Sequence, residues 1–161
     1  MALMLKNMSI RNETHGMASQ LQGQVVGLDS APLIYFIEEN PTYLEMTDAF
    51  FEAMVRGDFR VVTSVVTLLE VLVYPLRQGN RILAQQYRDI LFNEVGLTTI
   101  EVSLAIAEVA AQLRASYNLQ TPDSIQMATA ISGGAAFFLT NDARLPSLPG
   151  LEVLVLEELR A

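Results

Sequence analysis

Short apolar runs alternate with longer segments of helical period along most of the chain. The short runs predict strands, at residues 24–29, 59–64, 97–101, 135–141 and 151–159. Segments in which apolar residues return every three or four positions predict helices, at 31–39, 41–57, 65–75, 80–96, 102–118 and 121–134. Several of the strands are apolar throughout, so both faces of their sheet must be covered. These patterns predict an α/β fold with a mostly parallel sheet of about five strands.

Proline and threonine residues mark several of the expected helix ends. Pro41 is predicted in the first turn of its helix, and Pro75 helps to end the helix that contains it. Thr121 is predicted as the N-cap of the last of these helices, with Pro122 as its first residue. These residues support the boundaries that the periodicity suggests.

The first 23 residues show neither pattern. They lack the sustained apolar core of a signal peptide, so we expect a flexible extension at 1–23 and one folded domain at 24–161. Charged residues interrupt every apolar stretch before it reaches the roughly 18 residues of a membrane span, so no membrane helix is expected. The absence of cysteine excludes a disulfide framework and a cysteine nucleophile, and it fits a cytoplasmic location.

Acidic residues outnumber basic ones, which gives the chain a net charge of −8 at pH 7. A protein that holds a long duplex by neutralising its phosphates is normally basic. The charge therefore leaves three possibilities: no nucleic acid at all, a short stretch of it held by a few arginines, or carboxylates that act through bound cations.

Four carboxylates stand where apolar segments end or are interrupted. Asp29 follows the first predicted strand and Asp142 the fourth, while Asp123 lies in the first turn of the helix before that fourth strand. Glu70 interrupts the apolar helix VVTLLEVLVY, where a buried carboxylate would need a partner or a metal. The carboxyl ends of parallel strands meet at one edge of a sheet, so the acids are expected to converge there. Taken singly, each aspartate also fits a turn or a helix start.

A cluster of like charges is tolerated where cations bind it. The donors here are oxygens, and the single histidine, His15, lies in the N-terminal extension, so Mg²⁺ or Mn²⁺ is favoured over zinc. Asp29, Glu70 and Asp123 are predicted to hold the principal ion, directly or through water, with Asp142 completing a second or weaker site. Such a site activates water and orients a phosphodiester for hydrolysis. The sequence contains no GxxxxGK[ST] or GxGxxG loop and no Ser-His or Cys-His pair for other chemistry.

Four segments together resemble a known family. They read, in order, VVGLDSAPLIYFIE, TSVVTLLEVLVYP, TPDSIQMATAI and FFLTNDARL. In this order and spacing they are similar to the PIN domain, and most of all to the VapC-type toxin ribonucleases of type II toxin–antitoxin systems. The resemblance extends from about Gln24 to the C-terminus. The set of four motifs is much more specific than any single acid.

The resemblance implies a three-layer α/β/α sandwich, an endoribonuclease that depends on Mg²⁺ or Mn²⁺, RNA as substrate, a homodimer, and a small antitoxin protein as partner. The catalytic and metal-binding acids of the family fall on Asp29, Glu70, Asp123 and Asp142. Polar residues predicted to contact the substrate or a metal-bound water are Ser30, Thr140, Asn141 and Arg144. Arg144 is alternatively explained as an ion-pair partner of Asp142. Gln126 stands where relatives often have a histidine, and this departure is expected to affect substrate contact more than metal binding.

Two other features concern the surface. Arg77, Arg81 and Arg88 lie along one predicted helical segment and are expected on a solvated face, with RNA contact as the alternative. Aromatic and methionine residues recur at helical spacing between residues 32 and 55. Most are expected in the core, and the rest in an apolar groove for a second copy of the chain or an antitoxin helix.

Three alternative functions stay open. A regulatory or interaction module would keep the fold without the reaction, although all four acids are present. A phosphatase with an aspartate nucleophile needs a second acid close to the first, and the residues after Asp29 are SAPLI. A nuclease directed at DNA would need additional basic helices to embrace a duplex.

Overall fold

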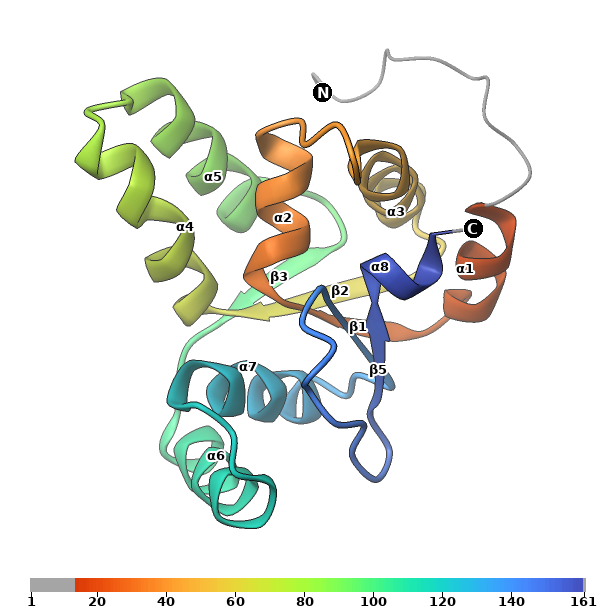
Figure 1. Cartoon of the computed structure of the whole chain (residues 1–161), viewed down its shortest axis with the longest axis vertical. Coiled ribbons are helices and arrows are strands. Elements are labelled where there is room, and N and C mark those ends of the chain that lie inside the picture. Colours follow the sequence, from red (N-terminus) through yellow and green to blue (C-terminus); the bar gives the residue numbers. More distant parts are fainter. Residues whose placement is uncertain (1–13, 161) are drawn as a thin grey trace.

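A five-stranded sheet forms the centre of the molecule in this computed structural model, which describes residues 14–160 (Figure 1). The strands are β1 (Val25–Leu28), β2 (Arg60–Ser64), β3 (Leu97–Ile100), β4 (Phe137–Thr140) and β5 (Glu152–Val155). They lie in the order β3-β2-β1-β4-β5, and every neighbouring pair is parallel. The predicted fold class is therefore confirmed.

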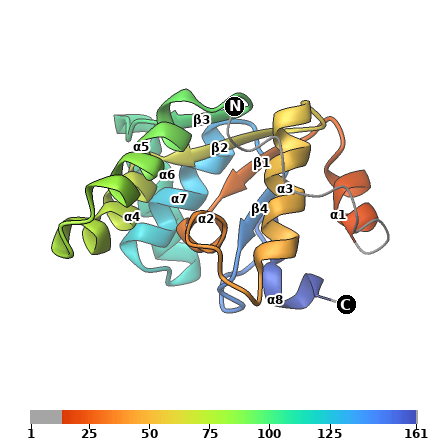
Figure 2. The same ribbon diagram turned by 90° about the horizontal axis from the view of Figure 1, so that it is seen from above.

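Helices cover both faces of the sheet. They are α1 (Thr14–Leu21), α2 (Ser30–Ile37), α3 (Leu44–Arg56), α4 (Val65–Arg77), α5 (Arg81–Asn93), α6 (Leu104–Tyr117), α7 (Thr121–Ser132) and α8 (Leu156–Leu159). Helices α6 and α7 pack on one face, while α1 to α5 and α8 build the core on the other (Figures 1 and 2). This is the three-layer sandwich that the resemblance implied. Among the described helices, none has the length and apolar character needed to cross a membrane.

Alternate residues of the strands supply two separate cores. In β1, Val26 and Leu28 join the core on the α1–α5 side, whereas Val25 packs against the core beneath α6 and α7. In β4, Leu139 joins the core on the α1–α5 side and Phe138 joins the core beneath α6 and α7. Successive side chains of a strand face opposite sides of the sheet, so both sets must be apolar when both faces are covered. This requirement explains why the strands read as continuous apolar runs.

The N-terminal segment differs from expectation. Residues 14–21 form helix α1, and Leu21 is fully buried in the core, with Met17 packed against it. These two residues are four positions apart, which places them on one face of a helix. This part of the predicted flexible extension at 1–23 is therefore packed on the domain, whereas residues 1–13 lie outside the described residues.

Several element ends also differ from expectation. The strand predicted at 151–159 ends at Val155, and helix α8 follows it. The backbone N–H of Glu157 in this helix donates to the side-chain oxygen of Asn141 at 2.9 Å. That bond satisfies a donor that the first turn of a helix otherwise leaves unpaired. Pro41 precedes α3, and α4 continues past Pro75, while Thr121 is the first residue of α7 rather than its cap.

The carboxyl ends of β1 and β4 meet where the chain reverses its direction across the sheet. From β1 the chain continues to β2 on one side, whereas β4 pairs on the other side. Leu28 is in register with Leu139, and the backbone N–H of Asp29 donates to the carbonyl of Leu139 at 2.9 Å. In open parallel sheets, ligands bind beyond the strand ends at such a switch point.

Gly27 allows α7 to approach β1 closely. A Cβ atom at this position would lie 2.5 Å from the Cβ of Ala130 and 2.9 Å from a ring carbon of Phe138. Both neighbours are buried, so the packed interior leaves no room for it. The missing side chain thus helps to set the position of α7, the helix that carries Asp123.

We predict that Gly27→Ala lowers the free energy of unfolding by about 2 kcal/mol, because it overpacks a filled site. Urea denaturation followed by circular dichroism measures this change. Gly16→Ala in α1 is the matched control, since nothing lies within 4 Å of its Cβ position, and it should leave stability unchanged or slightly higher. A Gly27→Ala protein as stable as the wild type would show that α7 is not held at this distance.

Candidate active site

Asp29 is held at the end of β1 by two hydrogen bonds. The backbone N–H of Ser30 donates to its Oδ1 at 2.8 Å, and the hydroxyl of Thr140 donates to its Oδ2 at 2.7 Å. Burial raises the pKa of Asp29, these hydrogen bonds oppose the rise, and the carboxylates of Asp123 and Glu70 add to it. The net direction is upward. Asp29 therefore lies in a poorly solvated and negatively charged environment, and it also caps helix α2.

Glu70 lies on α4 with its side chain exposed, which contradicts the expectation that it is buried. Helix α4 turns Thr67 and Pro75 to the core and leaves Leu69 and Glu70 at the surface. The sequence suggested burial because α4 is apolar on two faces. Only one of these faces packs on the core, and the described residues leave the other exposed. The hydroxyl of Ser30 nevertheless donates to Oε1 of Glu70 at 2.9 Å and ties it to the residue beside Asp29.

Asp123 lies in the first turn of α7 and receives no hydrogen bond from any described residue. Burial raises its pKa, and the carboxylates of Asp142 and Glu70 raise it further, while the guanidinium of Arg144 lowers it. These influences place Asp123 within electrostatic reach of two other acids. Its carboxylate oxygens are available to an ion or to water.

Asp142 is engaged by Arg144, as one of the sequence-based alternatives proposed. The Nε and Nη2 atoms of Arg144 donate to the two oxygens of Asp142, each at 2.9 Å, and its backbone N–H donates at 3.0 Å. The hydrogen bond from the guanidinium holds the pKa of Asp142 below its ordinary value. The backbone N–H of Asp142 donates in turn to Thr140, so one threonine hydroxyl contacts both acids that follow the paired strands.

The four acids are linked electrostatically, although their side chains are not grouped closely around one point. Within residues 14–160, no group of three or more His, Cys, Asp or Glu side chains is placed to hold a metal ion. The donors are nevertheless all carboxylates beside one switch point, and two of them have raised pKa values caused in part by the others. Donors of this kind suit Mg²⁺ or Mn²⁺. Binding would have to draw the carboxylates together against their repulsion.

The polar residues predicted to contact the substrate lie among the acids. Ser30 and Thr140 are buried and donate to carboxylates, so in this structure they orient the acids. The amide of Asn141 donates to the hydroxyl of Tyr35 at 3.3 Å and also accepts the helix bond from Glu157. Substrate contact by these residues stays a prediction. Arg144 is the member with an exposed side chain, at 90%.

Gln126 is 2% exposed, and its amide donates to Thr67 and Glu70. Its side chain therefore lies beneath the acids, and the expectation that this departure affects substrate contact more than metal binding stays a prediction. Thr67 and its hydrogen-bonded neighbour Thr63 were not anticipated as part of the site. Thr63 lies near the end of β2 and Thr67 in the first turn of α4, so no helical periodicity in the sequence marked the pair.

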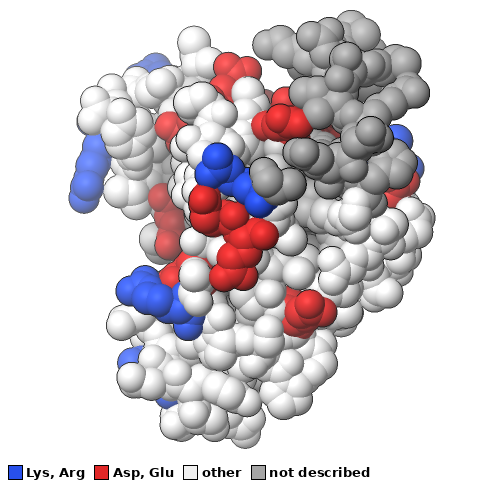
Figure 3. Space-filling view, turned by 45° about the vertical axis from the view of Figure 1, so that its right-hand side comes forward, with Lys and Arg blue, Asp and Glu red and all other residues white. Residues whose placement is uncertain are grey.

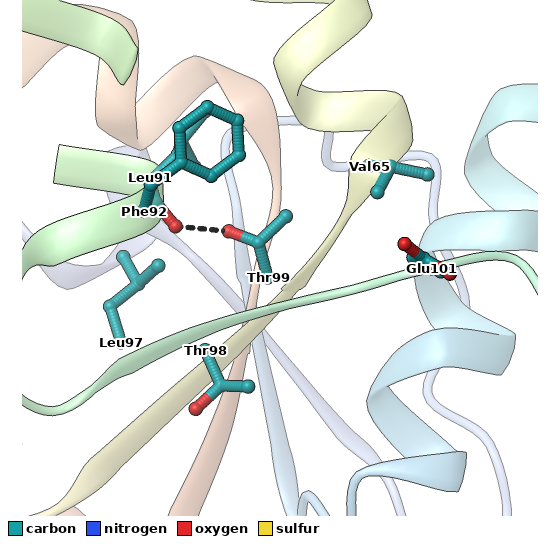
Figure 4. A pocket seen from close by; sticks show the side chains of 7 residues that line it. All are labelled: Val65, Leu91, Phe92, Leu97, Thr98, Thr99 and Glu101. Carbon is teal, nitrogen blue, oxygen red and sulfur yellow. Dashed lines mark hydrogen bonds between the residues drawn. The ribbon is translucent and has the colours of Figure 1, made fainter. Parts of the chain in front are cut away.

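A separate cleft of about 360 Å³ lies along strand β3 (Figure 4). It is lined by Val65, Leu91, Phe92, Leu97, Thr98, Thr99 and Glu101. Thr99 uses its hydroxyl to bind the carbonyl of Leu91 at 2.6 Å. None of the four predicted acids lines this cleft, and its single carboxylate offers no comparable chemistry.

Exposed apolar side chains gather on α4 and α5 rather than between residues 32 and 55. We call this surface the α4–α5 patch; its residues are Leu69, Val73, Tyr74, Leu76 and Ile82. Many of the aromatic and methionine side chains between 32 and 55, including Phe36, Phe50 and Met54, are buried. Their predicted place in the core is confirmed.

A family model described as the PIN domain matches residues 26–151, a range that contains all four acids. Comparison with curated protein sequences gives no significant match. The matched range covers most of the chain, and the order of the strands and helices around the sheet is consistent with it.

Solved structures share this fold. A chain of VapBC2 from Rickettsia felis, bound to a DNA fragment from their promoter, has a TM-score of 0.65 and 18% identity, covering 81% of this chain and 98% of that one. A chain of DNA-bound VapBC from Salmonella typhimurium has a TM-score of 0.62 and 17% identity, covering 83% of this chain and 98% of that one. A chain of a toxin–antitoxin complex from Klebsiella pneumoniae has a TM-score of 0.55 and 23% identity, covering 79% of this chain and 94% of that one. At these identities the likeness to the solved structures concerns the fold alone. Because the PIN domain model matches most of its length, this chain belongs to the PIN domain family.

Proposed function

We propose that this protein is a metal-dependent endoribonuclease of the VapC type, acting as the toxin of a toxin–antitoxin pair. The observation that carries this proposal is the electrostatic coupling of Asp29, Glu70, Asp123 and Asp142 beside the switch point of a PIN domain. Structures with the same fold include toxin–antitoxin complexes, which supports a small antitoxin as partner.

The four acids divide into ligands of a principal ion and a ligand of a second site. Asp29, Glu70 and Asp123 hold the principal Mg²⁺ or Mn²⁺ ion, directly or through water, and Asp142 completes a second or weaker site. When bound, the ion lowers the pKa of a water and stabilises the leaving oxygen of the phosphodiester. Ser30 and Thr140 fix the orientation of Asp29, so that one of the ligands is ordered before binding.

The charge distribution favours a short, locally bound stretch of RNA. On the face drawn in Figure 3, acidic side chains gather near the middle with only a few basic side chains beside them. Arg144 stands next to the acids and supplies a guanidinium for one phosphate. Arg77 and Arg81 are exposed, as expected for a solvated face, and Arg88 is half-buried. With a net charge of −8, the protein has little means to coat a long duplex.

A catalytically silent interaction module is the second candidate. It is favoured by one observation: within the part of the chain that the structure describes, no three acidic side chains are grouped closely enough to hold an ion together. In that case the Arg144–Asp142 pair would be a permanent structural contact. Metal binding separates the two candidates.

Cleavage of labelled total RNA tests the proposed function. We expect cleavage with Mn²⁺ or Mg²⁺, none with EDTA, and a loss of at least about a hundredfold in Asp123→Asn, because one ligand of the principal ion is removed. Glu108→Gln is the matched control, since it neutralises an exposed acid on α6 outside the cluster. A folded protein that neither binds Mn²⁺ nor cleaves RNA would favour the interaction module.

The stability of Asp123→Asn should depend on metal and pH. The folded-state pKa of Asp123 lies above its ordinary value of 3.8, so its ionisation costs the folded protein stability as pH rises. In EDTA at pH 7 we expect the variant to be more stable by about 0.5 kcal/mol, and this gain to vanish below pH 3.8.

Metal should reverse this order, because Mn²⁺ at ten times its Kd stabilises only the protein that binds it, by about 1.4 kcal/mol. Thermal unfolding of both proteins, with EDTA and with Mn²⁺, measures the two differences. A variant less stable than the wild type in both conditions would show that Asp123 is a purely structural residue.

The α4–α5 patch is proposed as the homodimer interface. Ile82 on α5 is 77% exposed and Leu69 on the neighbouring helix α4 is 66% exposed, and exposed apolar surface of this kind marks association sites. We predict a dimer by size-exclusion chromatography with light scattering, and a monomer for Ile82→Glu. Leu104→Glu on α6, where the side chain is 90% exposed, should remain dimeric. Dissociation by the α6 substitution alone would move the interface to the other face.

A further inference from the structure

A line of buried hydrogen bonds runs beneath the acids. The hydroxyl of Thr63 donates to the carbonyl of Leu28 at 2.8 Å, and the hydroxyls of Thr63 and Thr67 are 2.7 Å apart. The amide Nε2 of Gln126 donates to the hydroxyl of Thr67 at 2.6 Å. All three side chains are buried, and together they join the ends of β1 and β2 to α4 and α7. We call them the Thr63–Thr67–Gln126 network.

The number of available protons sets the direction of every bond in this network. A carbonyl cannot donate, so the single proton of Thr63 goes to Leu28. The contact between the two hydroxyls must then use the proton of Thr67. Thr67 is left as an acceptor toward Gln126, so the amide must present an N–H to it. A turned amide would set two oxygens 2.6 Å apart with no proton between them.

The same amide nitrogen reaches Glu70. Its second N–H points to Oε1 of Glu70 at 3.4 Å, and the hydroxyl of Ser30 donates to that same oxygen at 2.9 Å. Oε2 of Glu70 accepts no hydrogen bond from the residues that the structure describes. The carboxylate is therefore held by one oxygen and offers the other.

We infer that the Thr63–Thr67–Gln126 network positions the Glu70 carboxylate for metal binding, with Thr67 and Gln126 as positioning residues. This role rests on the proposed function of the site. An exposed glutamate samples many rotamers, and ordering it before an ion arrives lowers the entropic cost of binding. Hydrogen bonds to the far oxygen of a ligand carboxylate commonly set metal affinity in this way.

One buried atom marks the cost of this arrangement. Oε1 of Gln126 is buried and has no hydrogen-bond partner within the described residues. Buried polar atoms are normally paired, so an unpaired one requires a reason. Here the reason is the supply of donors: turning the amide to pair Oε1 would take away the N–H groups that donate to Thr67 and Glu70. The network keeps its direction toward Glu70 at the expense of that oxygen.

The substitution Thr67→Val tests the network with little change of shape, because it removes the hydroxyl and keeps the volume. We expect the Kd for Mn²⁺, measured by titration calorimetry or by electron paramagnetic resonance, to rise about tenfold. Thr67→Ser keeps the hydroxyl and should stay within about twofold of the wild type. Gln126→Met, which removes the amide but fills its space, should weaken Mn²⁺ binding as Thr67→Val does.

Two controls separate positioning from general stability. Thr47→Val removes an equally buried hydroxyl in α3, whose bonds go to the backbone of its own helix segment, and should leave the Kd for Mn²⁺ unchanged. In a Glu70→Gln background, Thr67→Val should cause no further loss of affinity, since its effect acts through Glu70. Circular dichroism confirms that each variant is folded.

The outcomes distinguish the two levels of inference. If the wild type, Thr67→Val and Gln126→Met all bind Mn²⁺ with the same Kd, the network's role is overturned and the proposed function is left standing. An additive loss in the Glu70→Gln background would also overturn it, because the effect would then bypass Glu70. A wild type that binds no Mn²⁺ would overturn both.

Discussion

The parallel pairing of β1 with β4 brings two carboxylates to one edge of the sheet, and the carboxylate of Asp123 lies within electrostatic reach of both. Asp29 and Asp142 follow these strands, and the hydroxyl of Thr140 contacts both residues. Arg144 neutralises Asp142, while Asp29 and Asp123 retain pKa values raised by burial and by neighbouring acids. A site of this kind is poised for a cation, since positive charge would relieve both the repulsion and the burial of negative charge.

Rigid elements hold most of the polar atoms around that edge. The hydroxyls that reach the acids come from a helix start and a strand end, and a fully buried network lies beneath them. Gly27 lets α7 lie close to β1, which positions Asp123 relative to Asp29. The two acids on helices keep oxygens free of hydrogen bonds from the described residues: Asp123 accepts none, and Glu70 accepts them at Oε1 alone. These oxygens are the ones available to an ion.

Much of this architecture could be predicted from the sequence, because a sheet covered on both faces demands apolar residues at every strand position. The mostly parallel sheet of about five strands and the shared edge of Asp29 and Asp142 follow from that pattern, and the three layers follow from the family resemblance, whereas the order of the strands was not predicted. The exposure of Glu70 could not be predicted, since an apolar helix reads the same whether its second apolar face meets the core or solvent. The packing of α1 through Leu21 and the contact of Thr67 with Gln126 depend on tertiary neighbours that periodicity does not encode.

Crystals of the protein soaked in Mn²⁺, with data collected at the manganese absorption edge, test the central claim most directly. We expect an anomalous peak bounded by Asp29, Glu70 and Asp123, with the side chains of Glu70 and Asp123 drawn toward it. A second, weaker peak beside Asp142 would require Arg144 to release that carboxylate. Anomalous density elsewhere on the molecule, or none among these acids at millimolar Mn²⁺, would contradict the claim that the cluster is a metal centre.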